Sequence, residues 1–270
     1  MTVRMQSGVV MVAVMVGFSN SARAQNGVME FYNSFDPNRP TIIGVHGWFG
    51  SISNADTFGR SPTFAQRANC IGWDWDATFI RDIIPNAERS GRQLAEEFAA
   101  YIRTQHPGYN QPIQLVGHSL GTHVVLECAA HLRDLGRTDP NFEEYQADQV
   151  TLVDTGFGGA PIQQKIDEIQ SDYLVPLKMD NYWSPSSAGG TGQAYLGPFP
   201  DIQIPVSHIN LWYWYWTSLD QTPVGPLDPG GTYGQAGALA DLDVGAATVT
   251  MISGQGTPLI VSDDRFRATR

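Results

Sequence analysis

The sequence predicts an α/β protein in which a mostly parallel sheet is covered by helices on both faces. Two observations lead to this fold class. Strand-like and helix-like segments alternate along the chain. The 270 residues are 42% hydrophobic and only 16% charged, which allows a sizeable core, and 28 glycines and 17 prolines indicate many structured turns.

The first half of the chain supplies two short strands and an amphipathic helix. Residues 41–45 (TIIGV) are rich in β-branched side chains, and residues 70–75 form a second short run of this kind. Helical spacing follows over residues 87–103, where apolar side chains recur every fourth position from Leu94.

The next three elements surround a glycine-flanked serine. Residues 113–116 predict a strand that ends at Gly117. Residues 120–135 predict a largely apolar helix closed by Gly136, and residues 150–153 (VTLV) predict a further strand.

The last elements are less regular. Residues 174–179 indicate another strand, although Pro176 fits only at its start or at a sheet edge. Residues 184–205 are rich in Gly, Ser and Pro and predict a long loop that could serve as a lid. Residues 211–219 (LWYWYWTSL) predict a short aromatic helix, whose side chains could pack on the sheet or meet an apolar substrate.

The N-terminal 24 residues resemble an export signal. Arg4 gives a positive start, residues 9–18 form a short apolar run, and residues 22–24 (ARA) offer a small-x-small cleavage site. The run is too short to cross a bilayer comfortably, so we expect cleavage before Gln25 rather than a permanent anchor, and no integral span after it. A secreted or periplasmic protein is expected.

Charge and cysteine content exclude several partners. The net charge of −11 disfavours nucleic acid and anionic lipid surfaces, so any transient contact with a lipid interface would be hydrophobic. Cys70 and Cys128 are the two cysteines of the chain. An exported protein could pair them, but two separate buried thiols are the simpler expectation. No motif indicates a metal or a cofactor.

Ser119 is the candidate nucleophile. It lies in Gly-x-Ser-x-Gly at residues 117–121 (GHSLG), between a predicted strand and a predicted helix. Such a turn lifts the serine out of the sheet, its glycines let neighbouring elements approach closely, and the helix N-terminus favours developing negative charge.

Three motifs together resemble one enzyme family. Residues 117–123 (GHSLGTH) resemble the nucleophile segment of lipases in the α/β-hydrolase superfamily, and residues 46–48 (HGW) resemble their oxyanion loop. Residues 206–208 (VSH), followed by aromatic residues, are similar to the catalytic-histidine segment of pancreatic and lipoprotein lipases. The resemblance implies an α/β-hydrolase fold and a serine-hydrolase activity.

His208 is the candidate general base. A serine hydroxyl needs a base to remove its proton, and the superfamily places the histidine after the serine and the acid. Of six histidines only His208 lies in the C-terminal half. The others are expected to have structural or solvated positions: His46, His106, His118, His123 and His131.

Two aspartates compete for the role of the acid. Asp154 follows the strand at 150–153, where pancreatic-type lipases carry a Leu-Asp-Pro-Ala-like segment, although here Thr155 replaces the proline. Asp180 follows the next expected strand, where most other α/β-hydrolases place the acid. We favour Asp154 and keep Asp180 as the alternative.

The oxyanion hole needs two backbone donors. The N–H of Leu120, directly after the nucleophile, is one candidate, and the N–H of Trp48 is the other. Gly47 and Gly50 would let that loop curl toward the serine.

These residues favour a secreted serine hydrolase of carboxylic esters, a lipase or esterase acting on a small-molecule or lipid ester. The alternative is a non-catalytic lipid- or ligand-binding protein on the same scaffold. The expected organisation is a signal peptide (1–24), a catalytic domain (25–220) and a Gly-rich extension (221–270) packed on it.

Overall fold

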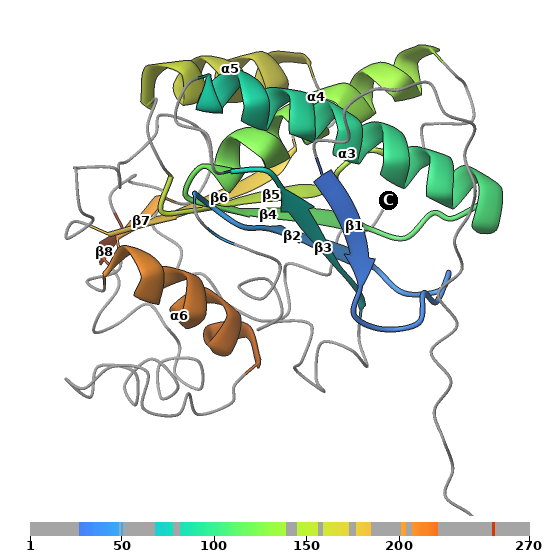
Figure 1. Ribbon diagram of the computed structural model, residues 1–270, viewed down its shortest axis with the longest axis horizontal. Helices are drawn as coiled ribbons and strands as arrows, with labels where there is room; N and C mark the ends of the chain where they lie inside the picture. Colours follow the sequence, from blue (N-terminus) through green and yellow to red (C-terminus); the bar gives the residue numbers. More distant parts are fainter. Residues whose placement is uncertain are drawn as a thin grey trace, which may run out of the picture.

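The described residues of the computed structural model form one eight-stranded sheet with the order β1-β3-β2-β4-β5-β6-β7-β8 (Figure 1). The structure describes residues 27–48, 50, 68–77, 82–138, 145–155, 159–172, 177–184, 201–203, 207–220 and 250–251. Its strands are β1 (Gly27–Phe31), β2 (Thr41–Val45), β3 (Asn69–Trp75), β4 (Ile113–His118), β5 (Gln149–Val153), β6 (Lys178–Trp183), β7 (Asp201–Gln203) and β8 (Thr250–Met251).

The strands from β3 to β7 are parallel, and the two outermost pairs are antiparallel. β2 pairs with both β3 and β4, while β1 runs antiparallel to β3 and β8 antiparallel to β7. Every residue of β2, β4 and β5 is buried. Burial on both faces is typical of parallel sheets between two helical layers.

Helices cover both faces of this sheet. Helices α3 (Ile83–Gln105), α4 (Gly121–Thr138) and α5 (Gly159–Asp172) lie on one side, and α6 (His208–Asp220) lies on the other (Figure 1). The expected mostly parallel α/β architecture is therefore confirmed.

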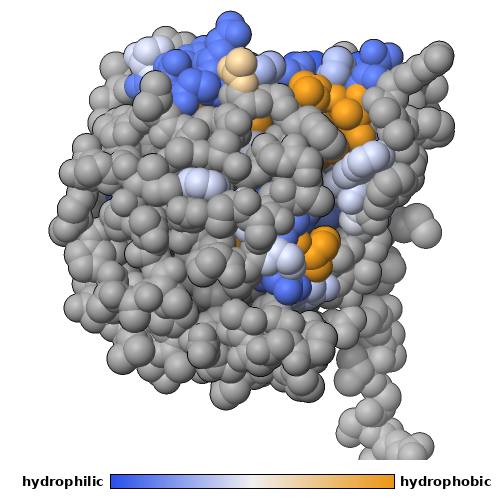
Figure 2. Space-filling model, turned by 90° about the vertical axis from the view of Figure 1, so that its left-hand side faces the viewer, coloured by the Kyte–Doolittle hydropathy of each residue, from blue (hydrophilic) through white to orange (hydrophobic). Residues whose placement is uncertain are grey.

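Charged side chains join the three helices of the first layer. Glu127 of α4 is buried and lies 2.5 Å from Arg92 of α3 and 3.0 Å from Lys165 of α5. The outer surface of the layer is polar, and hydrophilic side chains line the upper rim of the molecule at this level (Figure 2). One buried carboxylate thus holds neighbouring helices together beneath a solvated surface.

The structure extends or corrects several predicted elements. Helix α4 continues through Gly136, which is buried, to Thr138 instead of ending there, since a single glycine weakens a helix without necessarily ending it. Strand β1 and helix α5 were not expected. Helix α5 buries Ile162, Ile166 and Ile169, whose spacing places them on one face.

Strand β6 begins later than expected. It starts at Lys178, after Leu177, and residues 174–176 of the expected strand lie outside the described residues. Asp180 therefore lies inside the strand rather than after it. The carboxyl end of β6 is at Trp183.

Both cysteines are buried and free. Burial raises the pKa of the Cys70 thiol to about 12, and burial together with the charge of Glu127 raises the pKa of Cys128 even further. The two thiols are separate core groups, as the simpler expectation had it.

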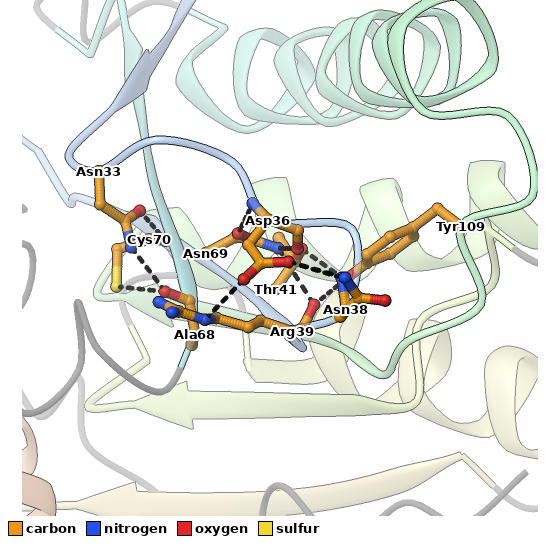
Figure 3. A network of polar contacts seen from close by, with 9 residues as sticks. All are labelled: Asn33, Asp36, Asn38, Arg39, Thr41, Ala68, Asn69, Cys70 and Tyr109. Atoms are coloured by element: carbon orange, nitrogen blue, oxygen red, sulfur yellow. Dashed lines mark hydrogen bonds and ion pairs between the residues drawn. The ribbon is translucent and has the colours of Figure 1, made fainter.

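At the amino ends of the parallel strands, side-chain amides fasten the loop between β1 and β2 (Figure 3). Asn69, the first residue of β3, accepts a hydrogen bond from the Asp36 N–H at 2.7 Å and donates to the carbonyls of Asp36 and Arg39 at 2.9 and 3.1 Å. Asn33 accepts from the Cys70 N–H at 2.9 Å and donates to the Ala68 carbonyl at 2.7 Å. The side-chain amides of Asn33 and Asn69 thus satisfy backbone groups of this loop and of β3.

Several expectations lie outside the described residues. They are the signal peptide at 1–24, residues 185–200 and 204–205 of the possible lid, and all of 221–270 except β8. Among the helices that the structure describes, none is long and apolar enough to cross a membrane.

Candidate active site

Ser119 occupies a tight turn between β4 and α4. Its φ of 54° lies in the left-handed region, which costs a non-glycine residue about 1–3 kcal/mol. The turn is held because the Ser119 N–H donates to the Val153 carbonyl of β5 at 2.9 Å. A Cβ on Gly121 would lie 2.6 Å from the carbonyl oxygens of Val45 and His46, so only glycine allows α4 to approach β2 here.

Asp154 lies at the carboxyl end of β5 and also has a positive φ, 46°. Its side chain is fully buried, and both carboxylate oxygens accept hydrogen bonds. Oδ1 accepts from the Ser184 N–H at 3.0 Å, and Oδ2 accepts from Nδ1 of His208 at 2.7 Å. The carboxylate therefore fixes the His208 tautomer, with the proton on Nδ1 and a lone pair on Nε2.

His208 is the first residue of α6. Its side chain is 27% exposed, and its Nδ1 faces Asp154. Among the described residues, no hydrogen bond joins His208 to Ser119 Oγ. The structure thus brings the histidine and the favoured aspartate into direct contact, while within the part of the chain that it describes the serine hydroxyl has no hydrogen bond to the histidine.

Asp180 has different neighbours. Within β6 its Oδ1 accepts from Thr151 Oγ1 at 2.6 Å and from Gln149 Nε2 at 3.3 Å, both on β5. Thr151 also accepts a hydrogen bond from Gln114. Asp180 thus belongs to a polar network between strands and does not contact His208.

The oxyanion-loop candidate packs directly on the serine. A Cβ on Gly47 would lie 2.6 Å from the Cβ of Ser119, so the loop backbone approaches as closely as glycine permits. The His46 ring holds this loop, since its Nδ1 donates to the Gly47 carbonyl at 2.9 Å and its Nε2 lies 2.9 Å from Asp74 Oδ1. Trp48 follows and packs, half-buried, against the core.

These pieces share one edge of the sheet. A strained serine follows a central parallel strand and precedes a helix, an aspartate follows the next strand, and a histidine bonded to it comes later in the chain. This order and this strand-turn-helix geometry define the α/β-hydrolase architecture. The chain has the α/β-hydrolase fold.

Two curated proteins are similar to part of the chain. No family model matches the chain. Over 156 residues it is 24% identical to inactive pancreatic lipase-related protein 1 of Canis lupus familiaris and to that of Mus musculus, which covers 55% of this chain and 31% and 30% of the relatives. The chain spans about three tenths of the length of these curated relatives.

A solved structure gives a distant match. It is that of a predicted CIB-like hydrolase from Thermoplasma acidophilum, which is 12% identical, with a TM-score of 0.42, and covers 80% of this chain and 93% of its own.

His118, which directly precedes Ser119 at the end of β4, contacts His208. Its Nε2 lies 3.1 Å from the His208 carbonyl oxygen, and the two rings are tilted with centroids 4.7 Å apart. Burial and the neighbouring His208 lower the pKa of His118 to about 3. This ring is therefore neutral at ordinary pH.

The remaining histidines have other surroundings. His106 stacks on Phe35 and is half-buried rather than fully solvated. His131 lies 3.4 Å from Glu96 of α3, and His123 is buried in α4. Within the described part of the chain, no group of His, Cys, Asp and Glu residues has the arrangement of a metal site.

Motif reasoning missed two groups of the site. The Ser184 N–H reaches Asp154 because β6 ends beside β5, and no pattern signals a backbone donor. The bond from His118 to His208 joins residues 90 positions apart, which spacing alone does not reveal.

Proposed function

We propose that this α/β-hydrolase fold carries a serine hydrolase that cleaves carboxylic esters, with Ser119 as nucleophile, His208 as general base and Asp154 as the acid of the triad. The observation that supports it most is the 2.7 Å bond between Asp154 and His208 Nδ1 at the edge where strained Ser119 stands. That bond leaves the Nε2 lone pair to accept the serine proton.

The reaction has two halves. Ser119 Oγ attacks the ester carbonyl carbon while His208 Nε2 takes the hydroxyl proton, and Asp154 stabilises the imidazolium. The tetrahedral intermediate expels the alcohol, which takes that proton, and leaves an acyl-serine. Water, deprotonated by His208, then attacks the acyl carbon, the bond from that carbon to Ser119 Oγ breaks as His208 returns the proton to Oγ, and the carboxylic acid leaves.

The developing oxyanion needs donors beside Ser119. The N–H of Leu120, directly before α4, and the N–H of Trp48, on the loop that packs against the serine, are the proposed pair. The serine-histidine bond would form with substrate, since catalytic hydrogen bonds often tighten only in the complex.

Lipid esters are the proposed substrates. Ile209, directly after the base, is 52% exposed and gives the site an apolar neighbour. The net charge of −11 leaves hydrophobic contact as the means of approaching a lipid. The resemblance of residues 117–123 and 206–208 to lipases agrees with this class.

Export is part of the proposal. The positive start, apolar run and ARA site at residues 22–24 support a mature chain that begins near Gln25 in the periplasm or outside the cell. N-terminal sequencing of protein from the native host tests this, and a retained Met1 in cytosolic protein would refute it.

The alternative is a binding protein on the hydrolase fold. The names of the two relatives, which describe inactive proteins, are the observation that favours it. Such a protein would bind lipid esters without forming an acyl-serine.

A fluorophosphonate probe and p-nitrophenyl esters from acetate to palmitate separate the two. Wild type should form an adduct on Ser119 and hydrolyse esters, and Ser119→Ala should lower turnover roughly 10⁴- to 10⁶-fold. Ser171→Ala, the same change at an exposed position of α5, should keep both properties. An adduct on another serine, or none, would contradict the proposal.

A further inference from the structure

We propose that His118 is a positioning residue, whose ring N–H holds the backbone of His208 in place beside Ser119. The inference rests on the proposed function, because it concerns how the base of that site is placed. No motif assigns this role, because Gly-x-Ser-x-Gly leaves the residue before the serine unspecified.

The contact joins two elements that are far apart in sequence. His118 Nε2 lies 3.1 Å from the His208 carbonyl oxygen, across 90 residues of chain. The His118 ring also lies against Trp212, one turn later on α6, with centroids 5.3 Å apart. The first turn of α6 is therefore fastened to the last residue of β4.

The position of His118 makes this attachment informative. Ser119 is the next residue, and its own N–H is fixed to the Val153 carbonyl. The nucleophile and the group that holds the base are thus consecutive residues of one buried strand end. The separation of Ser119 and His208 is set by this short path rather than by the long segment that joins them in sequence.

The chemistry of an imidazole suits this task. A carbonyl oxygen only accepts hydrogen bonds, so Nε2 of His118 must carry the proton, and the neutral ring is a donor there. Burial keeps the ring neutral, because it lowers the pKa of His118 to about 3. A neutral donor holds the base without placing a second positive charge beside the imidazolium that forms during catalysis.

A second attachment should keep α6 docked when the first is removed. Tyr215, two turns after His208, is fully buried, and its hydroxyl accepts a hydrogen bond from Gln114 Nε2 of β4 at 3.1 Å. Loss of the His118 bond should therefore loosen the first turn without releasing the helix. Misplacement of a catalytic group by about 1 Å costs on the order of 100-fold in rate.

The test compares two replacements of His118. His118→Leu removes the donor, and His118→Gln keeps an N–H at a similar reach. With p-nitrophenyl acetate, we expect kcat to fall roughly 10- to 100-fold in His118→Leu, with KM within about twofold, and to return to within about threefold of wild type in His118→Gln. His131→Leu, the same change at a position on α4 outside this contact, should have wild-type kinetics.

Two outcomes would overturn the inference in an active enzyme. One is wild-type kcat in His118→Leu, and the other is a His118→Gln variant as slow as His118→Leu. Melting curves give the folded fraction of each variant and so separate loosened geometry from unfolding. A loss of fold would lower the active fraction, but it would leave kcat per folded molecule the same in His118→Leu and His118→Gln.

A spectroscopic measurement decides the matter even if the wild type proves inactive. The Nδ1 proton of His208, held by Asp154, should give a downfield NMR resonance in wild type and in His118→Gln, and should broaden or vanish in His118→Leu. An unchanged resonance in His118→Leu would refute the attachment. An absent fluorophosphonate adduct in wild type would instead refute the proposed function.

Discussion

The two ends of the parallel strands use polar side chains in opposite ways. At the amino end, the side chains of Asn69 and Asn33 form hydrogen bonds with backbone groups of the loop between β1 and β2 and of β3 (Figure 3). At the carboxyl end, Ser119 and Asp154 have positive φ values, and the serine hydroxyl has no hydrogen bond among the described residues. Backbone strain at these two residues therefore lies at one edge, which is where a site that must bind and react is expected.

The largest expected effect concerns the buried carboxylates of β5 and β6. Asp154→Asn should lower kcat/KM roughly 10⁴-fold, because an amide no longer fixes the His208 tautomer or stabilises its charge. Asp180→Asn is the matched change in a buried carboxylate bonded to Thr151 and Gln149, and should alter kcat/KM less than about threefold. Ester hydrolysis at neutral pH measures both.

The reverse outcome would be decisive. An inactive Asp180→Asn beside an active Asp154→Asn would move the acid one strand later, and two active variants would require another account of the base.

The amino end should control stability and leave the chemistry unchanged. Asn69→Ala removes four hydrogen bonds to a buried side chain and should lower the free energy of unfolding by about 2–3 kcal/mol. Urea denaturation measures this change, and active-site titration gives kcat per folded molecule. A kcat reduced tenfold with little loss of stability would contradict the separation of the two ends.

The third effect is a dependence of stability on pH, which arises from His118 at the carboxyl end of β4. The pKa of His118 is lowered to about 3 in the fold, whereas an unfolded histidine titrates near 6.5. Between these values the unfolded chain binds the extra proton, so stability is fully present above pH 6.5 and falls as pH falls. From pH 7 to pH 5 wild type should lose about 2 kcal/mol more than His118→Gln. Equal losses in denaturant titrations would contradict the assignment.

The smallest expected effect is an absence of reaction. Cys70 and Cys128 are buried, and burial raises the pKa of both thiols. Iodoacetamide at pH 8 should therefore modify neither thiol in the folded protein and both after denaturation, as mass spectrometry would show. Rapid modification of the native protein would contradict this expectation, because it would mean that the core opens often enough to expose these thiols.

Local patterns predicted the tight turn at Ser119 and the strands around it because these elements depend on residues close in sequence. Gly117, Ser119 and Gly121 define a turn, and the buried runs of β2 and β5 are short and β-rich. The start of α6 at His208 is similarly near its expected place.

Elements that depend on distant partners were predicted poorly. Strand β6 contains Lys178, Asp180 and Asn181, and such polar residues disfavour a buried strand until Thr151 and Gln149 of β5 supply hydrogen bonds to Asp180. Helix α5 did have a local signal in the spacing of Ile162 and Ile166. The choice of acid was left open by the sequence because it depended on where β6 begins.

The short path from Ser119 through His118 to His208 has a consequence for evolution and engineering. Asp154 and His208 are 54 residues apart, yet hydrogen bonds to residues at strand ends hold His208 in place, rather than the chain between them. Insertions, deletions or grafted loops between α5, β6 and β7 of that interval should therefore be tolerated without altering the reactive geometry, provided that Ser184 keeps its bond to Asp154. Substrate range could then diversify through this segment while the catalytic edge of the sheet stays constant.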